Sequence, residues 1–315
     1  MLRDSAPSGS EAWQALGVGP QRRQNQMMKA TLSAALVVIA SVTLSSAQAQ
    51  DPLRGAGSRR VDPYRVIGNI FYVGAEGISA HLIVTPQGLI LLDTGTREML
   101  PGLRANIAKL GHKLTDVKII LSSHAHWDHV EGHATMKDLT GAQVMAVGDD
   151  AAAIASGKDN SALGSDGWPP TKVDRILKDG DTVTLGGVTL TAHLTPGHTK
   201  GCTTWTTTVQ ENGRPYNVVF IGALSINEGV KLIGNQRHPS IADDYARTFR
   251  VLKGLKPDVF LAQHPSIYGM EEKMKRLAAG AAQNPFIDPD GYRRVVSEAE
   301  AAYLKQLERE KAAGR

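Results

Sequence analysis

Short apolar runs, separated by glycine and proline turns, make up most of the chain beyond its N-terminal part. In the first half of this region the runs predict buried strands at 69–73, 81–84, 89–93, 117–121 and 143–147. Apolar residues at helical spacing follow the third run, at Met99, Leu100, Leu103, Ile107 and Leu110. A strand meander followed by alternating helices and strands predicts a sheet packed with helices.

The second half of the chain shows the same pattern of short apolar runs separated by turns. Its apolar runs predict strands at 182–185, 188–191, 218–221 and 259–262. One helix face is predicted by the spacing of Ile241, Tyr245, Phe249 and Leu252, and a terminal helix is predicted at 298–311. Two β-runs, each with helices, predict two similar halves whose sheets lie face to face, with the helices outside.

The N-terminal residues carry a targeting pattern. A lysine precedes the apolar run 32–44, and Ala47-Gln48-Ala49 is an A-x-A cleavage signal. We therefore predict that residues 1–50 are a signal peptide with an N-terminal extension, cleaved near Ala49, and that residues 51–315 form a single domain in the periplasm. An uncleaved membrane anchor is the alternative, although the run is short for a membrane span.

Composition places the chain among ordinary soluble proteins. Of its 315 residues, 42% are hydrophobic and 21% are charged, which is enough for one large core. The formal net charge of +4 shrinks when the first fifty residues are removed, and no block of like charge remains, so nothing predicts nucleic-acid binding. The one cysteine, Cys202, excludes an intrachain disulfide. We expect it to be a small buried residue in a strand with Trp205, with a role as ligand or nucleophile as the alternative.

One stretch, Ser122–His129, concentrates side chains that bind metals. Three histidines and one aspartate lie within six residues there, directly after a strand predicted to be buried. Buried polar groups need partners, and buried charges need pairing or a metal. His124 and His126 are two apart on an extended segment, so they point the same way and can share one ion. Asp128 and His129 lie farther along the turn, where they could face a second ion.

Two lone histidines complete the candidate site. His198 and His264 each follow a predicted apolar strand, and strand-end residues from separate places can converge on one edge of a sandwich. Zinc prefers imidazole and carboxylate ligands, and a catalytic zinc site leaves one position open for water. The histidine pattern therefore predicts a metal centre at the ends of three strands.

These motifs carry a resemblance to a known family. His124–His129 reads HAHWDH, Leu91–Gly95 precedes it and Pro196–Thr199 follows it, and together they resemble the metallo-β-lactamase superfamily. The third (B-three) subclass is the most similar, on the strength of His129 and of further segments at Gly197–Trp205, Gly234–Asn235, Asp244–Tyr245 and Gln263–Pro265. Other hydrolases of the superfamily have a metal-bridging Asp after the strand at 218–221, where this chain has Gly222–Ser225.

The resemblance implies a fold, a cofactor and a reaction. The fold is α/β (α+β by some schemes), a four-layer αββα sandwich. Two zinc ions (Zn²⁺) are implied, one held by His124, His126 and His198 and the other by Asp128, His129 and His264. A metal-bound hydroxide would hydrolyse the amide bond of penicillins, cephalosporins and carbapenems and so give antibiotic resistance. Asp128 would balance the second zinc, and Ser225 would donate a hydrogen bond to the substrate carboxylate.

Other functions remain open at this point. The first is a periplasmic lactonase or thioesterase-like di-zinc hydrolase with weak β-lactamase activity, and the second is a non-catalytic zinc-binding protein. Either way the expected partner is a small molecule, with neither nucleic acid nor, after signal cleavage, a membrane involved; the oligomeric state is not predicted.

Several residues outside the predicted ligand set depart from the family pattern or are titratable, and we assign an expected role to each. Glu131 either tunes the metals and substrate access or is a loop carboxylate that points to water. His133 is interpreted as a surface residue at a helix N-terminus, and Ala223 replaces a serine that helps to hold the substrate in several relatives. Asp93, which ends an apolar strand, is expected to orient the site. We expect structural or surface roles for the remaining histidines, His81, His112, His193 and His238.

Overall fold

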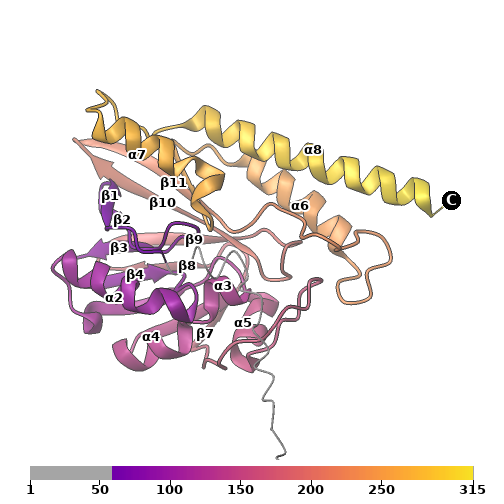
Figure 1. Ribbon diagram of the computed structural model, residues 1–315, viewed down its shortest axis with the longest axis horizontal. Coiled ribbons are helices and arrows are strands. Elements are labelled where there is room, and N and C mark those ends of the chain that lie inside the picture. Colours follow the sequence, from indigo (N-terminus) through magenta and orange to yellow (C-terminus); the bar gives the residue numbers. More distant parts are fainter. Residues whose placement is uncertain (1–58, 315) are drawn as a thin grey trace, which may run out of the picture. The chain divides into compact units, whose positions relative to one another are not determined.

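Two β-sheets lie face to face in the computed structural model, which describes residues 59–314 (Figure 1). The predicted signal peptide, residues 1–50, and its cleavage near Ala49 lie outside the described residues. Within 59–314, no helix combines the length and the apolar character that a membrane crossing requires.

The first sheet has seven strands whose spatial order follows the sequence. They are β1 (Tyr64–Ile67), β2 (Ile70–Tyr72), β3 (His81–Thr85), β4 (Gly88–Leu92), β5 (Val117–Leu121), β6 (Gln143–Val147) and β7 (Arg175–Leu177). Strands β1 to β4 pair antiparallel, as the predicted meander requires. Strands β4 to β7 pair parallel, because helices connect β4 to β5 and β5 to β6.

The second sheet has five strands, in the spatial order β12-β11-β10-β9-β8. Their bounds are β8 (Thr182–Leu185), β9 (Val188–Leu194), β10 (Thr203–Glu211), β11 (Arg214–Ile221) and β12 (Val259–Ala262). Three hairpin pairings are antiparallel, and β12 returns through a helix to pair parallel with β11.

The alternation of side chains along the strands divides the core into two parts. In β4, Ile90 and Leu92 pack into the cluster that lies between the sheets, whereas Leu89 and Leu91 pack into the cluster under the helices. Successive side chains of a strand point to opposite faces, so an unbroken apolar run can be buried on both faces. Trp205 of β10 is fully buried in the cluster between the sheets.

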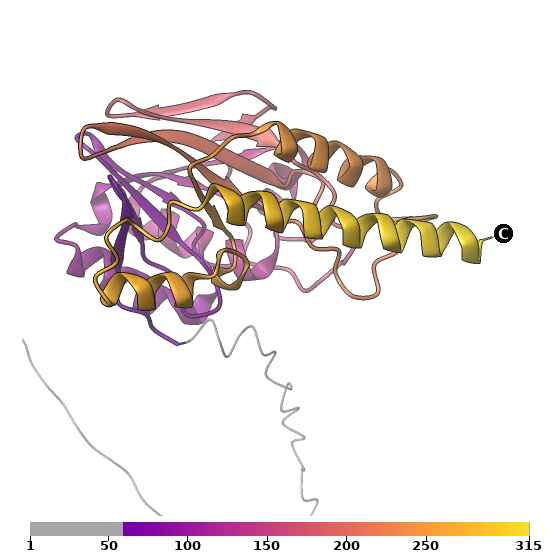
Figure 2. The same cartoon turned by 90° about the horizontal axis from the view of Figure 1, so that it is seen from above.

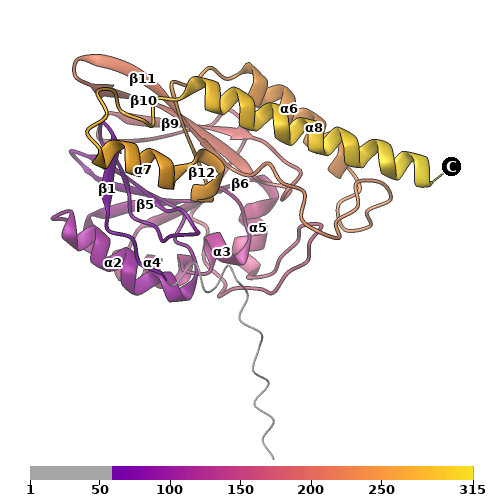
Figure 3. The same ribbon diagram turned by 45° about the horizontal axis from the view of Figure 1, so that its top comes forward.

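Helices cover the outer face of each sheet (Figures 1 and 2). On the first sheet they are α2 (Leu100–Lys109), α3 (Trp127–Val130), α4 (His133–Thr140) and α5 (Gly148–Ser156). On the other side of the molecule are α6 (Ile241–Gly254), α7 (Met270–Ala278) and α8 (Pro289–Ala313), of which α6 and α8 run side by side (Figure 3). The predicted four-layer αββα arrangement is confirmed.

The long C-terminal helix begins earlier than its charge pattern predicted. Helix α8 starts at Pro289 rather than at 298, because Asp288 caps it: its side chain accepts a hydrogen bond from Gly291 N at 2.9 Å, and proline is tolerated in the first turn. The sequence interpretation also missed β1, β7, α5 and α7. Strands β1 and β7 are short, and short elements give little periodic signal.

Candidate metal centre

The predicted ligands lie on loops that leave strands at one edge of the sandwich. His124 follows β5, His198 follows β9, and His264 follows β12, so ligands from both sheets meet where the sheets face each other. Asp128 and His129 lie in the short helix α3, which turns the chain directly after His126. Five of the six predicted ligand side chains are buried, and His264 is partly exposed.

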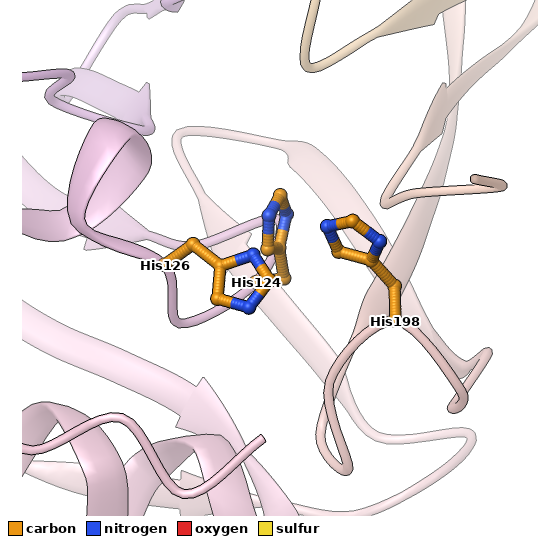
Figure 4. Close-up of side chains that lie close together, drawn as sticks. All are labelled: His124, His126 and His198. Carbon is orange, nitrogen blue, oxygen red and sulfur yellow. The ribbon is translucent and has the colours of Figure 1, made fainter. Parts of the chain in front are cut away.

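His124, His126 and His198 form the first half-site (Figure 4). Their ring centroids are 4.7 to 4.8 Å apart, and one nitrogen of each lies within 4.8 Å of the others. The Nδ1–H of His198 donates to the carbonyl oxygen of Ser225 at 2.7 Å, which leaves Nε2 of His198 free to bind a metal. The three imidazoles therefore converge on one point, as predicted.

Asp128 is the centre of the second half-site. Its Oδ2 lies 3.1 Å from Nε2 of His129 and 3.5 Å from Nε2 of His264. Nδ1–H of His264 donates to the carbonyl oxygen of Gly77 at 2.9 Å, so Nε2 is the nitrogen that remains for a metal. His124 also approaches Asp128 and His129, with ligand atoms within 4.8 Å of one another. The division of the ligands between two metals stays a prediction.

Buried nitrogens without partners show that these residues fit metal ions. Nε2 of His124 and both ring nitrogens of His129 are buried and make no hydrogen bond within residues 59–314. Burial, followed by the neighbouring histidines, lowers the pKa of His124, and burial and His126 lower the pKa of His198 to about 3. Neutral imidazole is the form that binds metal. A buried ring nitrogen without a partner, such as Nε2 of His124, is costly unless a cation binds it.

Charge in the second half-site is balanced by Asp128. Burial opposes its ionisation, but His129 and the other histidines hold the pKa of the Asp128 carboxyl below its usual value, so it is ionised at neutral pH. Burial would lower the pKa of His129, but Asp128 and Asp93 outweigh it and raise this pKa to about 10. A proton occupies His129 when no metal is bound, and a metal would replace it.

Asp93 supports the loop that carries the ligands. Its carboxylate accepts from Ser123 N at 2.7 Å and from Ser123 Oγ at 2.6 Å, and it lies 3.3 Å from Nδ1 of His129. The residue has a φ of 63°, which is unfavourable for an aspartate outside a turn, so the surrounding contacts hold it there. These contacts agree with the expectation that Asp93 orients the site.

The 157–171 connection, which sequence reasoning did not connect to the metal centre, supplies a partner for His126. Ser161 Oγ lies 3.1 Å from Nε2 of His126, which leaves Nδ1 of His126 for a metal. Asp159 accepts from Ser161 N at 2.7 Å and lies 4.0 Å from the same imidazole. Arg237, from the loop after β11, donates to the carbonyl oxygens of Ser161 and Asp159 at 2.9 and 2.8 Å. The length and the Gly-, Ser-, Asp- and Pro-rich composition of this connection favoured a functional role, and the Asx turn at Asp-Asn-Ser was a further signal.

Among the residues that follow the histidine motif, the surface position predicted for His133 was wrong, and so was one of the two alternatives for Glu131. His133 is not on the surface: it is fully buried, with Nδ1 2.8 Å from Thr94 Oγ1 and Nε2 2.9 Å from Ser122 Oγ. Glu131 does not point to water: its side chain is 3% exposed and accepts from Arg97 N and Nη2, both at 3.0 Å. Helix α4 packs inward against the sheet and so buries a position that its sequence alone leaves open.

The remaining histidines have structural surroundings. His81 is buried in an aromatic cluster against Tyr72 and Phe220, His193 lies 2.8 Å from Thr206 Oγ1, and His238 lies 2.7 Å from an Asp244 oxygen. His112 is half-buried and away from the cluster.

Cys202 and Ser225 differ in how far the structure supports their predicted roles. Cys202 is fully buried one residue before β10, as expected of a packing residue. Ser225 is exposed, and its carbonyl oxygen accepts from His198 and from Tyr245 Oη. The predicted contact of its hydroxyl with a substrate stays a prediction.

Comparisons with known proteins found both a matching family model and similar solved structures. Residues 73–264 match the family model described as "Metallo-beta-lactamase superfamily". The metallo-beta-lactamase FEZ-1 from Legionella gormanii is 38% identical with a TM-score of 0.78, over 80% of this chain and 98% of that chain. BJP-1, a subclass B3 metallo-beta-lactamase of Bradyrhizobium japonicum, is 39% identical with a TM-score of 0.77, over 82% of this chain and 98% of that one.

Similarity to other hydrolases is shorter. A hydroxyacylglutathione hydrolase of Methylobacterium is 36% identical over 92 residues, which is 29% of each protein. The chain matches about a third of the length of the curated relatives with which it aligns. The local resemblance therefore covers part of the domain, whereas the lactamase structures cover nearly all of their own length.

Proposed function

This chain belongs to the metallo-beta-lactamase superfamily, and from that premise we propose that it is a two-zinc hydrolase that opens the amide bond of β-lactams. The observation that carries the proposal is a centre made of histidines and one aspartate, with no carboxylate in the segment directly after β11, which reads Gly222-Ala223-Leu224-Ser225. Similarity to two structures named as metallo-beta-lactamases, at 38% and 39% identity over most of the domain, supports it.

Two sets of side chains would hold the metals, and bound zinc would supply a water-derived nucleophile at neutral pH and polarise the carbonyl under attack. His124, His126 and His198 would hold the first ion, and the second would lie between Asp128, His129 and His264. Thiolate ligands play no part, because Cys202, the only cysteine, is buried and belongs to neither group of converging ligand atoms in the described residues. Imidazole and carboxylate together are the donor set that catalytic zinc prefers.

The side chains themselves contribute orientation and charge. Backbone carbonyls hold His198 and His264 by Nδ1, which fixes the tautomer and the direction of Nε2. Asp128 keeps one negative charge in the buried centre, so a substrate that carries a carboxylate needs the positive charge of the metals beside it. The exposed hydroxyl of Ser225 lies on the loop that holds His198, where it could donate to that carboxylate.

Export and resistance belong to the same proposal. β-Lactams act outside the inner membrane, so an enzyme carrying a cleavable signal near Ala49 would meet them in the periplasm. Antibiotic resistance would follow from this location together with the hydrolysis.

A thioester or lactone hydrolase of the same fold is the second candidate. It is favoured by the local similarity to hydroxyacylglutathione hydrolases, whose name describes a thioester substrate. Both candidates use the same metal ligands, so variants of those ligands do not separate them. Only a comparison of substrates does.

Turnover of a substrate panel tests the proposal. Purified chain with zinc is assayed on a chromogenic cephalosporin, a penicillin, a carbapenem, a homoserine lactone and S-lactoylglutathione. We expect β-lactams to give the highest kcat/KM, the activity to disappear with a chelator and to return with zinc, and His264→Ala to lower it far more than Cys202→Ser. Faster turnover of the thioester or lactone favours the second candidate, and chelator-insensitive hydrolysis refutes both.

A further inference from the structure

One buried carboxylate joins the two loops that carry the first half-site. Asp150 is 1% exposed and lies in the first turn of α5. Its Oδ2 accepts from Ala125 N at 2.8 Å and from Thr199 Oγ1 at 2.6 Å, and its Oδ1 accepts from Gly201 N at 2.7 Å. Hydrogen bonds to an ionised acceptor are about twice as strong as neutral ones, so this is a firm connection.

The three donors come from both sides of the metal centre. Ala125 is the residue between His124 and His126, on the loop that leaves β5 of the first sheet. Thr199 and Gly201 directly follow His198, on the loop between β9 and β10 of the second sheet. A shift of either loop would stretch the bonds to Asp150, and all three imidazoles of the first half-site lie on these two loops.

The backbone of Gly201 lies in close contact with the start of α5, next to Asp150. A Cβ at Gly201 would lie 2.3 Å from the carbonyl oxygen of Val147, 2.5 Å from Asp150 N and 2.7 Å from Asp150 Cβ. Such distances are too short for any side chain. The glycine is therefore required by the close approach of the two backbones, independently of the hydrogen bonds.

We propose that Asp150 is a positioning residue for the first metal, which sets the spacing of His124 and His126 relative to His198 without touching the metal or the substrate. The inference rests on the proposed two-zinc function. Outer residues that hold ligands in place typically account for a 10- to 100-fold difference in metal affinity. Because its hydrogen bonds are made to Ala125, between two ligands of the first half-site, and to Thr199 and Gly201, after the third, Asp150 should affect that zinc and leave the second one unchanged.

Removal of the Asp150 charge should leave the fold intact. Two other hydrogen bonds join the loop after β5 to strand β10, from Thr203 N to Ser123 O at 2.8 Å and from Trp205 Nε1 to Ser122 O at 3.0 Å. Ser122 and Ser123 lie between β5 and the first ligand, His124. These two bonds therefore connect the sheets without fixing the positions of the ligands that follow. Asp150→Asn keeps the shape of the side chain but turns an amide NH₂ toward backbone and hydroxyl donors.

The test measures zinc affinity one site at a time. His264→Ala leaves the first half-site complete, and His198→Ala leaves the second. Asp150→Asn is added to each, and the dissociation constant for zinc is measured by competition with a chromogenic chelator. We expect at least a tenfold weaker affinity in the His264→Ala background and an unchanged affinity in the His198→Ala background. Circular dichroism and a thermal melt of the metal-free proteins check that the variants fold.

The chain offers a matched control in the neighbouring residue. Asp149 is exposed in the same helical turn, so Asp149→Asn makes the same chemical change without reaching either loop. Thr199→Val removes one of the three bonds and Thr199→Ser restores it, so this pair should show a smaller loss and its rescue. If Asp150→Asn does not fold, the comparison of Thr199→Val with Thr199→Ser is sufficient to test the proposal.

Three results would overturn the inference. They are equal affinities for Asp150→Asn and Asp149→Asn in the His264→Ala background, an equal loss in both backgrounds, or no difference between Thr199→Val and Thr199→Ser. A wild-type chain that binds no zinc would instead overturn the proposed function, and this inference with it. Failure of the positioning role alone therefore leaves zinc binding by the wild-type chain intact.

Discussion

Burial of His133 makes the stability of the metal-free protein depend on pH. The imidazole is fully buried between Thr94 and Ser122, and burial is the main reason that its pKa falls to about 4 from 6.5. The unfolded chain therefore binds this proton more tightly than the folded one. Its stabilising contribution is complete above pH 6.5 and is lost as the pH falls toward 4.

The size of the effect follows from the two pKa values. The change from 6.5 to about 4 corresponds to about 3 kcal/mol between the protonation states, and about 2 kcal/mol of this should be lost at pH 5. His133→Gln keeps polar contacts at the site but cannot titrate. The free energy of unfolding of this variant should therefore fall by about 2 kcal/mol less than that of the wild type between pH 8 and pH 5.

Urea unfolding of the metal-free proteins at pH 8 and pH 5 provides the measurement. The other buried histidines titrate in both proteins, so the difference between them isolates His133. His112→Gln, which removes a half-buried imidazole away from the cluster, is the control and should follow the wild type. The reasoning is refuted if His133→Gln loses as much stability as the wild type over this pH range.

Two further predictions concern the loops around the metal centre. Ser161→Ala removes the partner of His126 Nε2 and should weaken zinc binding about tenfold in a chelator competition; an unchanged dissociation constant would show that the hydroxyl does not hold the ring. Gly201→Ala places a Cβ 2.3 Å from Val147 O and should lower the melting temperature clearly, whereas Gly254→Ala, with open space around it, should not; equal melting temperatures would contradict the close approach.

Part of the candidate site could be predicted from the sequence because it is local. His124, His126, Asp128 and His129 are neighbours in the chain, and their chemistry is visible without knowing the fold. His198 could be assigned to the same site because a histidine at the end of an apolar strand lies at a sheet edge. The structure brings these residues together as expected.

The strands and the order of the layers could also be predicted from short-range patterns in the sequence. Short apolar runs such as 117–121 predict buried strands, and the alternation with helical stretches predicts helices outside the sheets. The bounds of α8 were not predicted, because the cap at Asp288 acts through one hydrogen bond that periodicity does not report.

Tertiary structure alone decided which polar residues are buried. Asp149 and Asp150 are adjacent and chemically identical, yet one is exposed and the other joins two loops, because only one faces the loop after β9. His133, at the start of α4, and Glu131, in the turn before it, are buried by contacts with Thr94 and Arg97, which lie more than thirty residues away in the sequence. Sequence determined the metal-binding chemistry, and long-range packing determined the side chains that hold it in place.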